Sequence, residues 1–223
     1  MAIYDNASNT YDQWYNKPMG KFVDDIQTKK ILEMFPFKKG ITVLDVGCGT
    51  GNYSIKLASM GCDVVGIDVS DNMLKIAQQK AKKQNLDINF INMDILKHTL
   101  KKESFDVVVS VTAFEFISNI AEAYKQIKKL VKPEGHILVG TIHKESPWGE
   151  LYASEYFQKN SIFAYANLKT VNDLENLDKT SLIKIEETLF TPPNTQPEEL
   201  NTNTEKYYAT QNRGGFICAL WKK

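Results

Sequence analysis

The feature that most constrains the fold is a short apolar run that ends in three glycines. Residues 41–46 read Ile-Thr-Val-Leu-Asp-Val, and glycines follow at positions 47, 49 and 51. A β-branched run of this length predicts a strand buried on both faces of a parallel sheet. Glycines directly after it let the backbone approach a ligand, because no Cβ stands in the way. The segment therefore predicts a strand, a turn and a helix at the sheet edge where doubly wound folds bind ligands.

The chain continues with the same alternation. Further strands are predicted at 63–68, 88–91, 105–111 and 136–142. Apolar side chains at helical spacing predict helices between them, one of which Ser70 can cap, and a helix is also predicted from about Lys21. Pro133 and Gly135 are predicted to end the helix that begins near Ile120. This alternation predicts an α/β fold with a doubly wound, Rossmann-like and mostly parallel sheet.

The last part of the chain has a different character. Residues 181–190 and 216–221 predict two strands joined without a helix, hence an antiparallel pair at one sheet edge and a seven-stranded sheet with an antiparallel last strand. Residues 144–180 are rich in aromatic side chains and predict a helical lid insertion. The 223 residues suit a single domain. Its predicted parts are an N-terminal cap and helix (1–40), a ligand-binding core (41–143), the lid (144–180) and the edge strand pair (181–223).

Composition excludes several classes of protein. Lysine plus arginine and aspartate plus glutamate both number 27, so the formal charge is zero and no nucleic-acid partner is expected. The amino terminus does not read as a secretory signal, and no apolar run approaches the roughly 20 residues that cross a bilayer, so no membrane partner is expected. The three cysteines lack paired metal-ligand spacing, which predicts reduced thiols, a cytoplasmic location and no metal site.

The glycine spacing discriminates between ligands. Dinucleotide-binding proteins usually carry G-x-G-x-x-G, whereas this chain has G-x-G-x-G followed by Asn52. A phosphate-binding P-loop would need a Gly-Lys-Ser/Thr sequence, which the chain does not have here. The spacing therefore disfavours an NAD-dependent oxidoreductase, although that alternative stays open.

The string from Asp45 to Gly51 resembles the first motif of class I S-adenosylmethionine-dependent methyltransferases. The resemblance extends over nearly all of the chain, through segments 65–70, 92–95, 104–110 and 130–136. Segments 11–15 and 146–149 resemble small-molecule members of the family. The resemblance implies S-adenosylmethionine as cofactor and a small-molecule methyl acceptor. No Asn/Asp-Pro-Pro-aromatic motif of nucleic-acid amino-methyltransferases follows residue 110.

The resemblance also implies which residues contact the cofactor. They are Tyr11, Tyr15, Asp45, Gly47, Cys48, Gly49, Thr50, Gly51, Asp68, Val69, Met73, Asp94, Ile95, Ser110 and Val111. Asp68 would accept hydrogen bonds from the ribose hydroxyls, and Asp94 one from the adenine amino group. Other readings stay open: Asp68 as a helix cap, Met73 as helix core, and the two tyrosines as packing for the N-terminal arm.

Methyl transfer is expected to be an in-line displacement, in which the cofactor supplies the activated methyl group and the protein mainly orients the reactants. Glu115 and His143 follow the fourth and fifth predicted strands and are the candidates for a catalytic base or an acceptor contact; the alternative is a structural polar role. Two further functions stay open, a non-catalytic cofactor-binding protein and an RNA or protein methyltransferase. Both a monomer and a homodimer are compatible with the sequence.

Overall fold

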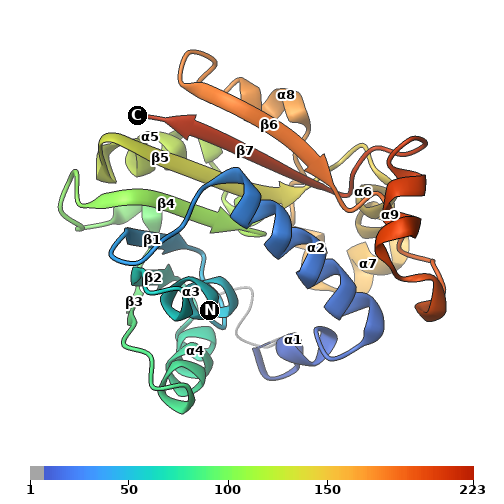
Figure 1. Ribbon diagram of the computed structural model, residues 1–223, viewed down its shortest axis with the longest axis horizontal. Helices are drawn as coiled ribbons and strands as arrows, with labels where there is room; N and C mark the ends of the chain where they lie inside the picture. The colour runs from blue at the N-terminus through green and yellow to red at the C-terminus, as the bar shows by residue number, and fades with distance from the viewer. Residues whose placement is uncertain (1–7) are drawn as a thin grey trace.

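Seven strands form one sheet in the order β3-β2-β1-β4-β5-β7-β6 (Figure 1). The computed structural model describes the backbone of residues 8–223 and the side chains of residues 11–223. The strands are β1 (Thr42–Val46), β2 (Asp63–Asp68), β3 (Asn89–Asn92), β4 (Phe105–Val111), β5 (Val131–Ile142), β6 (Leu182–Thr188) and β7 (Phe216–Lys222). Only β7 runs antiparallel to its neighbours, β5 and β6. The predicted fold class is therefore confirmed, with β7 inserted between β5 and the edge strand β6.

Helices cover both faces of this sheet. They are α1 (Ser8–Trp14), α2 (Pro18–Met34), α3 (Asn52–Ser59), α4 (Asp71–Lys83), α5 (Ile120–Leu130), α6 (Pro147–Ala153), α7 (Glu155–Asn160), α8 (Val171–Glu175) and α9 (Thr202–Tyr208). Short 3-10 segments are η1 (Ile95–Lys97), η2 (Phe114–Phe116), η3 (Ile162–Tyr165) and η4 (Pro197–Glu199). In Figure 1, α2 and α3 lie in front of the sheet, and α5 and α8 lie behind it.

Alternating strand residues fill the two layers between sheet and helices. Val43 packs in the same cluster as Ile31 of α2, whereas its neighbour Leu44 packs in the cluster of Ile127 from α5. All four side chains are fully buried. Strands buried on both faces explain why their sequences are apolar runs rather than alternating patterns.

Several element boundaries differ from the prediction. α2 begins at Pro18, because proline is favoured in the first turn, where its missing N–H costs nothing. α5 ends at Leu130 and β5 begins at once, so Pro133 lies inside a strand rather than at the helix end. The prediction that β6 and β7 are joined without a helix is wrong, because α9 lies between them. Its N-cap Asn201 accepts hydrogen bonds from two backbone N–H groups of the first turn.

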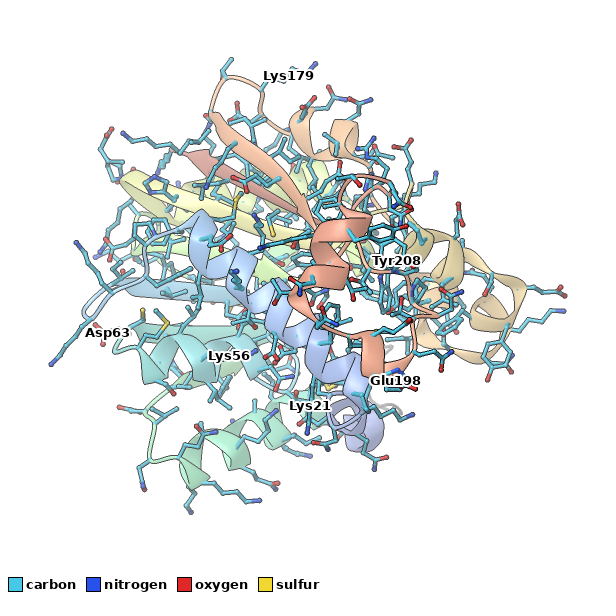
Figure 2. All side chains as sticks on the ribbon, turned by 45° about the vertical axis from the view of Figure 1, so that its right-hand side comes forward. Lys21, Lys56, Asp63, Lys179, Glu198 and Tyr208 are labelled. Carbon is cyan, nitrogen blue, oxygen red and sulfur yellow. The ribbon has the colours of Figure 1, made fainter. Side chains whose placement is uncertain are left out.

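The predicted lid divides into two parts. Residues 147–165 form α6, α7 and η3, which lie beyond the carboxyl end of β5, together with α1 and α9 (Figure 1). α8 instead packs against β6 and β7 and buries Leu174 completely. In Figure 2, Asp63 at the start of β2 lies on the left of the molecule, and Tyr208 and Glu198 lie on the opposite side.

The strand order reverses between β1 and β4. From β1 the chain builds β2 and β3 on one side, and β4 and β5 on the other. The loops after β1 and β4 therefore separate at the carboxyl edge and leave a crevice, the usual ligand site of open α/β sheets.

Candidate cofactor and acceptor cavities

The turn after β1 is built on left-handed backbone. Gly47, Gly49 and Gly51 have φ angles of 72°, 54° and 80°, a region that costs other residues energy. A Cβ added to Gly47 would lie 2.4 Å from the Cβ of Ala113, in the turn after β4. Residues 47–51, called the glycine loop below, thus pack directly against that turn, and glycine at position 47 is required by both backbone and space.

Asp68 joins the glycine loop to the end of β2. Its carboxylate accepts hydrogen bonds from the backbone N–H of Gly49 at 2.8 Å and of Ser70 at 2.9 Å. A carboxylate accepts hydrogen bonds on both oxygens, and these two bonds fix the orientation of Asp68 at the carboxyl end of β2. Ser70 in turn caps α4 through its hydroxyl, as predicted, by accepting from Met73 N–H.

A cavity of about 340 Å³, the first cavity, lies over these strand ends. It is lined by Tyr11, Tyr15, Asp45, Val46, Gly47, Cys48, Gly49, Thr50, Asn52, Tyr53, Ile67, Asp68, Val69, Met73, Met93, Asp94, Ile95, Leu96, Val111, Thr112, Ala113, Phe116, Ile117 and Ser118. Most of the predicted cofactor contacts are in this lining.

Gly51 and Ser110 are the two predicted contacts that the lining does not include. Gly51 precedes α3 and faces Ala77, where an added Cβ would approach to 2.9 Å. The Ser110 hydroxyl donates to the carbonyl of Val46 at 2.8 Å and is buried. Ser110 thus joins β4 to β1, and Gly51 lets the start of α3 pack closely against α4, so both residues support the walls of the first cavity.

The charge of the first cavity is negative. Asp45, Asp68 and Asp94 line it, and no lysine, arginine or histidine does so among the described residues. Burial raises the pKa of Asp45 to about 6, although a 2.6 Å hydrogen bond from the Ser54 hydroxyl works in the opposite direction. At neutral pH the lining therefore suits a cation and would repel the pyrophosphate of a dinucleotide.

The N-terminal helix α1 closes one side of the first cavity. Asp12 accepts from the Thr50 hydroxyl at 2.7 Å and pairs with Lys80 of α4 at 2.8 Å. The hydroxyls of Tyr11 and Tyr15 lie 3.2 Å apart. Burial raises the pKa of both phenols, so both are neutral at physiological pH and can hydrogen-bond but cannot serve as bases.

A second cavity of about 360 Å³ adjoins the first and shares four lining residues with it: Tyr11, Tyr15, Thr112 and Phe116. The other lining residues of the second cavity are Trp14, Met19, Val23, Gln27, Ile142, Trp148, Leu151, Tyr152, Phe157, Ile162, Phe163, Leu189, Pro193 and Gly215. No charged side chain of the described residues lines it. Eight of its 18 lining residues are aromatic, and the rings of Tyr152 and Phe163 stack with centroids 3.9 Å apart.

Glu115 and His143 line neither cavity. Glu115 is buried and accepts from the Thr141 hydroxyl at 3.1 Å and Ile142 N–H at 3.3 Å, and burial raises its pKa to about 7. The His143 ring is fully buried and donates from Nδ1 to the carbonyl of Gly214 at 3.0 Å. These placements correct the expectation that either side chain faces an acceptor, because both bond to the protein's own backbone.

Sequence reasoning missed several lining residues after β4. Thr112 is one: its φ of 50° is uncommon for a β-branched residue, and it lines both cavities. Strained backbone of this kind concentrates at functional sites. The residue itself carried no signal, because nothing in its sequence neighbourhood predicts left-handed backbone.

Comparison with known proteins agrees with this geometry. Residues 37–210, well over half of the chain, match the family model of a methyltransferase domain. The chain belongs to this methyltransferase family. The resemblance predicted from the glycine motif is thus confirmed, and the oxidoreductase alternative is set aside.

Individual relatives fit the same family. A ubiquinone biosynthesis O-methyltransferase of Coxiella burnetii is 32% identical over 142 residues, which cover 61% of this chain and 60% of that protein. One from Bartonella tribocorum is 26% identical, over 82% of this chain and 83% of its own. A crystal structure of an S-adenosylmethionine-dependent methyltransferase from Thermotoga maritima superimposes with a TM-score of 0.76 at 21% identity, covering 99% and 98% of the two chains. The match to the Coxiella protein thus spans about three fifths of that relative, and the Thermotoga structure shows a shared class I fold.

Two other features concern the described residues as a whole. None of their helices combines the length and the apolar character that a membrane span requires. Within residues 8–223, no three His, Cys, Asp or Glu side chains gather as metal ligands.

Proposed function

We propose that this chain transfers a methyl group from S-adenosylmethionine to a small, largely apolar molecule. The observation that carries the proposal is the first cavity, which combines the glycine loop with the three carboxylates of Asp45, Asp68 and Asp94 and has no basic side chain of the described residues in its lining. S-adenosylmethionine carries a sulfonium and an ammonium, and when bound it supplies an electrophilic methyl group with a good leaving group. The charge of the lining suits such a cation.

The residues that would hold the cofactor follow from the lining. Asp68 is placed to accept from ribose hydroxyls, and Asp94 lies after β3, where it could accept from a nucleobase amino group. Val69, Met73 and Ile95 offer apolar surface for a purine. The glycine loop permits close approach of the backbone to the ligand.

The acceptor would occupy the second cavity. An in-line displacement needs nucleophile, methyl group and leaving group on one line, so the acceptor must enter from a direction opposite to the leaving group. The four residues shared by the two cavities mark where the reactants would meet. Holding two reactants in this orientation can supply on the order of 7–11 kcal/mol of the barrier reduction.

The lining of the second cavity limits the chemistry of the acceptor. No carboxylate, histidine, lysine or arginine of the described chain lines it. The protein therefore offers no strong base there, and Tyr11 and Tyr15 remain neutral. The acceptor atom must be nucleophilic in its own right or lose its proton without a protein base.

The test combines binding with turnover. Calorimetric titration with S-adenosylhomocysteine and with NAD should show binding of the former alone. A screen of small phenols, thiols and amines should then release S-adenosylhomocysteine from S-adenosylmethionine. Tight binding without turnover on any acceptor would favour a non-catalytic cofactor-binding protein. Labelled methyl groups found only in RNA or protein would contradict the small-molecule proposal.

A further inference from the structure

The second cavity contains one polar side chain that the fold does not explain. Gln27 lies on α2 between Val23 and Ile31, one turn away on either side, and all three are buried. Positions four residues apart share a helix face, so Gln27 occupies a place in an apolar stripe. Leucine or methionine would be the ordinary residue there.

The amide of Gln27 makes no hydrogen bond to any residue that the structure describes, although the side chain is only 7% exposed and lines the second cavity. The polar atoms of the described residues that are both fully enclosed and unpaired belong to Tyr53, His98, His143 and Trp221. Gln27 is not among them, so its small remaining exposed surface opens onto the cavity.

The other polar groups around the second cavity are mostly engaged. The Trp148 indole N–H donates to the carbonyl of Thr191 at 2.9 Å. The hydroxyls of Tyr11 and Tyr15 bond to each other. The Tyr152 hydroxyl has no hydrogen bond within the described residues, but this side chain is only partly buried and its ring stacks on Phe163. Gln27 is therefore the most deeply buried polar group that a ligand could engage.

Buried polar side chains are nearly always hydrogen-bonded, and an exception calls for a partner that the protein alone does not provide. An amide offers both donors and an acceptor, so it pairs with a hydroxyl or a carbonyl but has no charge to neutralise an ion. Gln27 lines only the second cavity, whereas four residues at the junction with the first cavity line both. Its ligand group would thus be one that does not receive the methyl.

We propose that Gln27 recognises the acceptor by hydrogen bonding to a hydroxyl or carbonyl group of an uncharged aromatic molecule, away from the reacting atom. The inference rests on the proposed function in that it takes the second cavity as the acceptor site. It names the substrate class, a neutral ring with a second polar substituent, and it makes Gln27 the specificity-determining residue.

The test uses p-cresol and p-xylene, which differ only in a hydroxyl in place of a methyl. Their dissociation constants are measured by ligand-observed NMR titration with S-adenosylhomocysteine present, for the wild type and for Gln27→Leu. In the wild type, Gln27 should strengthen binding of p-cresol relative to p-xylene. That relative preference should fall roughly tenfold in Gln27→Leu, as expected for one lost hydrogen bond. Comparing ratios cancels the different hydrophobicity of the two probes.

A control and a second measurement keep the result unambiguous. Gln79→Leu removes an exposed glutamine from α4 and should leave the preference unchanged. The melting temperature of Gln27→Leu should equal or exceed that of the wild type, because an apolar side chain suits an apolar stripe. An unchanged preference in Gln27→Leu would overturn the inference, and so would failure of p-cresol to bind the wild type. A lowered melting temperature with the preference retained would overturn it too.

The outcome is separable from that of the proposed function. If the protein fails to bind S-adenosylhomocysteine in the calorimetric test, the proposed function fails. A preference for p-cresol that still depends on Gln27 would then uphold the recognition role without the methyl transfer.

Discussion

The two cavities are built in opposite ways. The first is lined by three carboxylates beside apolar side chains, and its wall comes mainly from four consecutive strand ends and the turns that follow them. The second is richer in aromatic side chains and uncharged, and its wall comes mainly from α1, α2, α6, η3 and the segment after β6. The strand ends of the sheet form most of the first cavity, whereas helices and loops outside the sheet form most of the second. The contrast teaches that a family's common chemistry can reside in the scaffold while acceptor choice resides in its additions.

The close packing of the glycine loop against the turn after β4 can be tested by substitution of Gly47. Gly47→Ala forces a side chain into left-handed backbone and 2.4 Å from the Cβ of Ala113. Strain of about 1–2 kcal/mol and overpacking of about 1–3 kcal/mol should together lower the free energy of unfolding by about 2–5 kcal/mol. Urea denaturation measures it.

Gly40→Ala is the matched control for this substitution. Gly40 has a φ of 83° but nothing within 4 Å of an added Cβ, so only the backbone strain of about 1–2 kcal/mol should remain. Equal losses in the two variants would show that the glycine loop is not held against the turn after β4.

Substitution of Glu115 tests whether this buried carboxyl group has a structural role or takes part in ligand binding. Burial raises its pKa from 4.5 to about 7, although hydrogen bonds and the charge of Lys169 act in the opposite direction. Between pH 4.5 and about 7, Glu115 is therefore protonated in the folded state and ionised in the unfolded chain. The associated stability is fully present below pH 4.5 and is lost as the pH rises to about 7. At about 1.36 kcal/mol per pKa unit, the loss is of the order of 3 kcal/mol.

The variant Glu115→Gln lacks this titration. Its free energy of unfolding, relative to that of the wild type, should therefore rise by about 3 kcal/mol between pH 4.5 and about pH 8. Glu198→Gln, an exposed replacement of the same kind, should show no such trend. Because Glu115 lines neither cavity, S-adenosylhomocysteine and p-cresol should bind the variant as they bind the wild type. Weaker binding of either ligand would show that Glu115 contributes to its binding site.

Asp68→Ala should separate the two cavities by ligand. S-adenosylhomocysteine affinity should fall roughly ten- to a hundredfold, since hydrogen bonds to a carboxylate are lost both by the ligand and by the backbone of Gly49 and Ser70. Binding of p-cresol to the second cavity should not change. Calorimetry measures the first and NMR titration the second, with Asp87→Ala as a control that removes an exposed carboxylate. Unchanged S-adenosylhomocysteine affinity would refute the ribose assignment.

The sequence predicted the first cavity better than the second for a physical reason. The glycine loop, Asp68 and Asp94 each stand at the end of an apolar run, so strand prediction alone places them on one sheet edge. Nothing comparable links Gln27 to Phe163, which line one cavity only because distant segments of the chain fold over the same strand ends. Periodicity cannot report such distant contacts.

The helix α9 was missed for a related reason. It has seven residues, mostly polar, and therefore no apolar periodicity. Glu205 holds it in place by accepting from the backbone N–H groups of Phe190 and Thr191, both at 2.9 Å. These tertiary bonds, and not the helix propensity of the segment, decide its conformation.

The smallest expected effect concerns the aromatic wall of the second cavity. Phe163→Ala removes the ring stacked on Tyr152 and should weaken p-xylene binding roughly three- to tenfold, the worth of one aromatic contact. S-adenosylhomocysteine binding should be unaffected. Tyr165→Ala is the control, because Tyr165 belongs to the same 3-10 segment but is 67% exposed and lines neither cavity. If Phe163→Ala weakened the binding of p-xylene and of S-adenosylhomocysteine equally, the two cavities would act as a single site. The distinction between a cavity formed by the sheet and one formed by the surrounding helices and loops would then not hold.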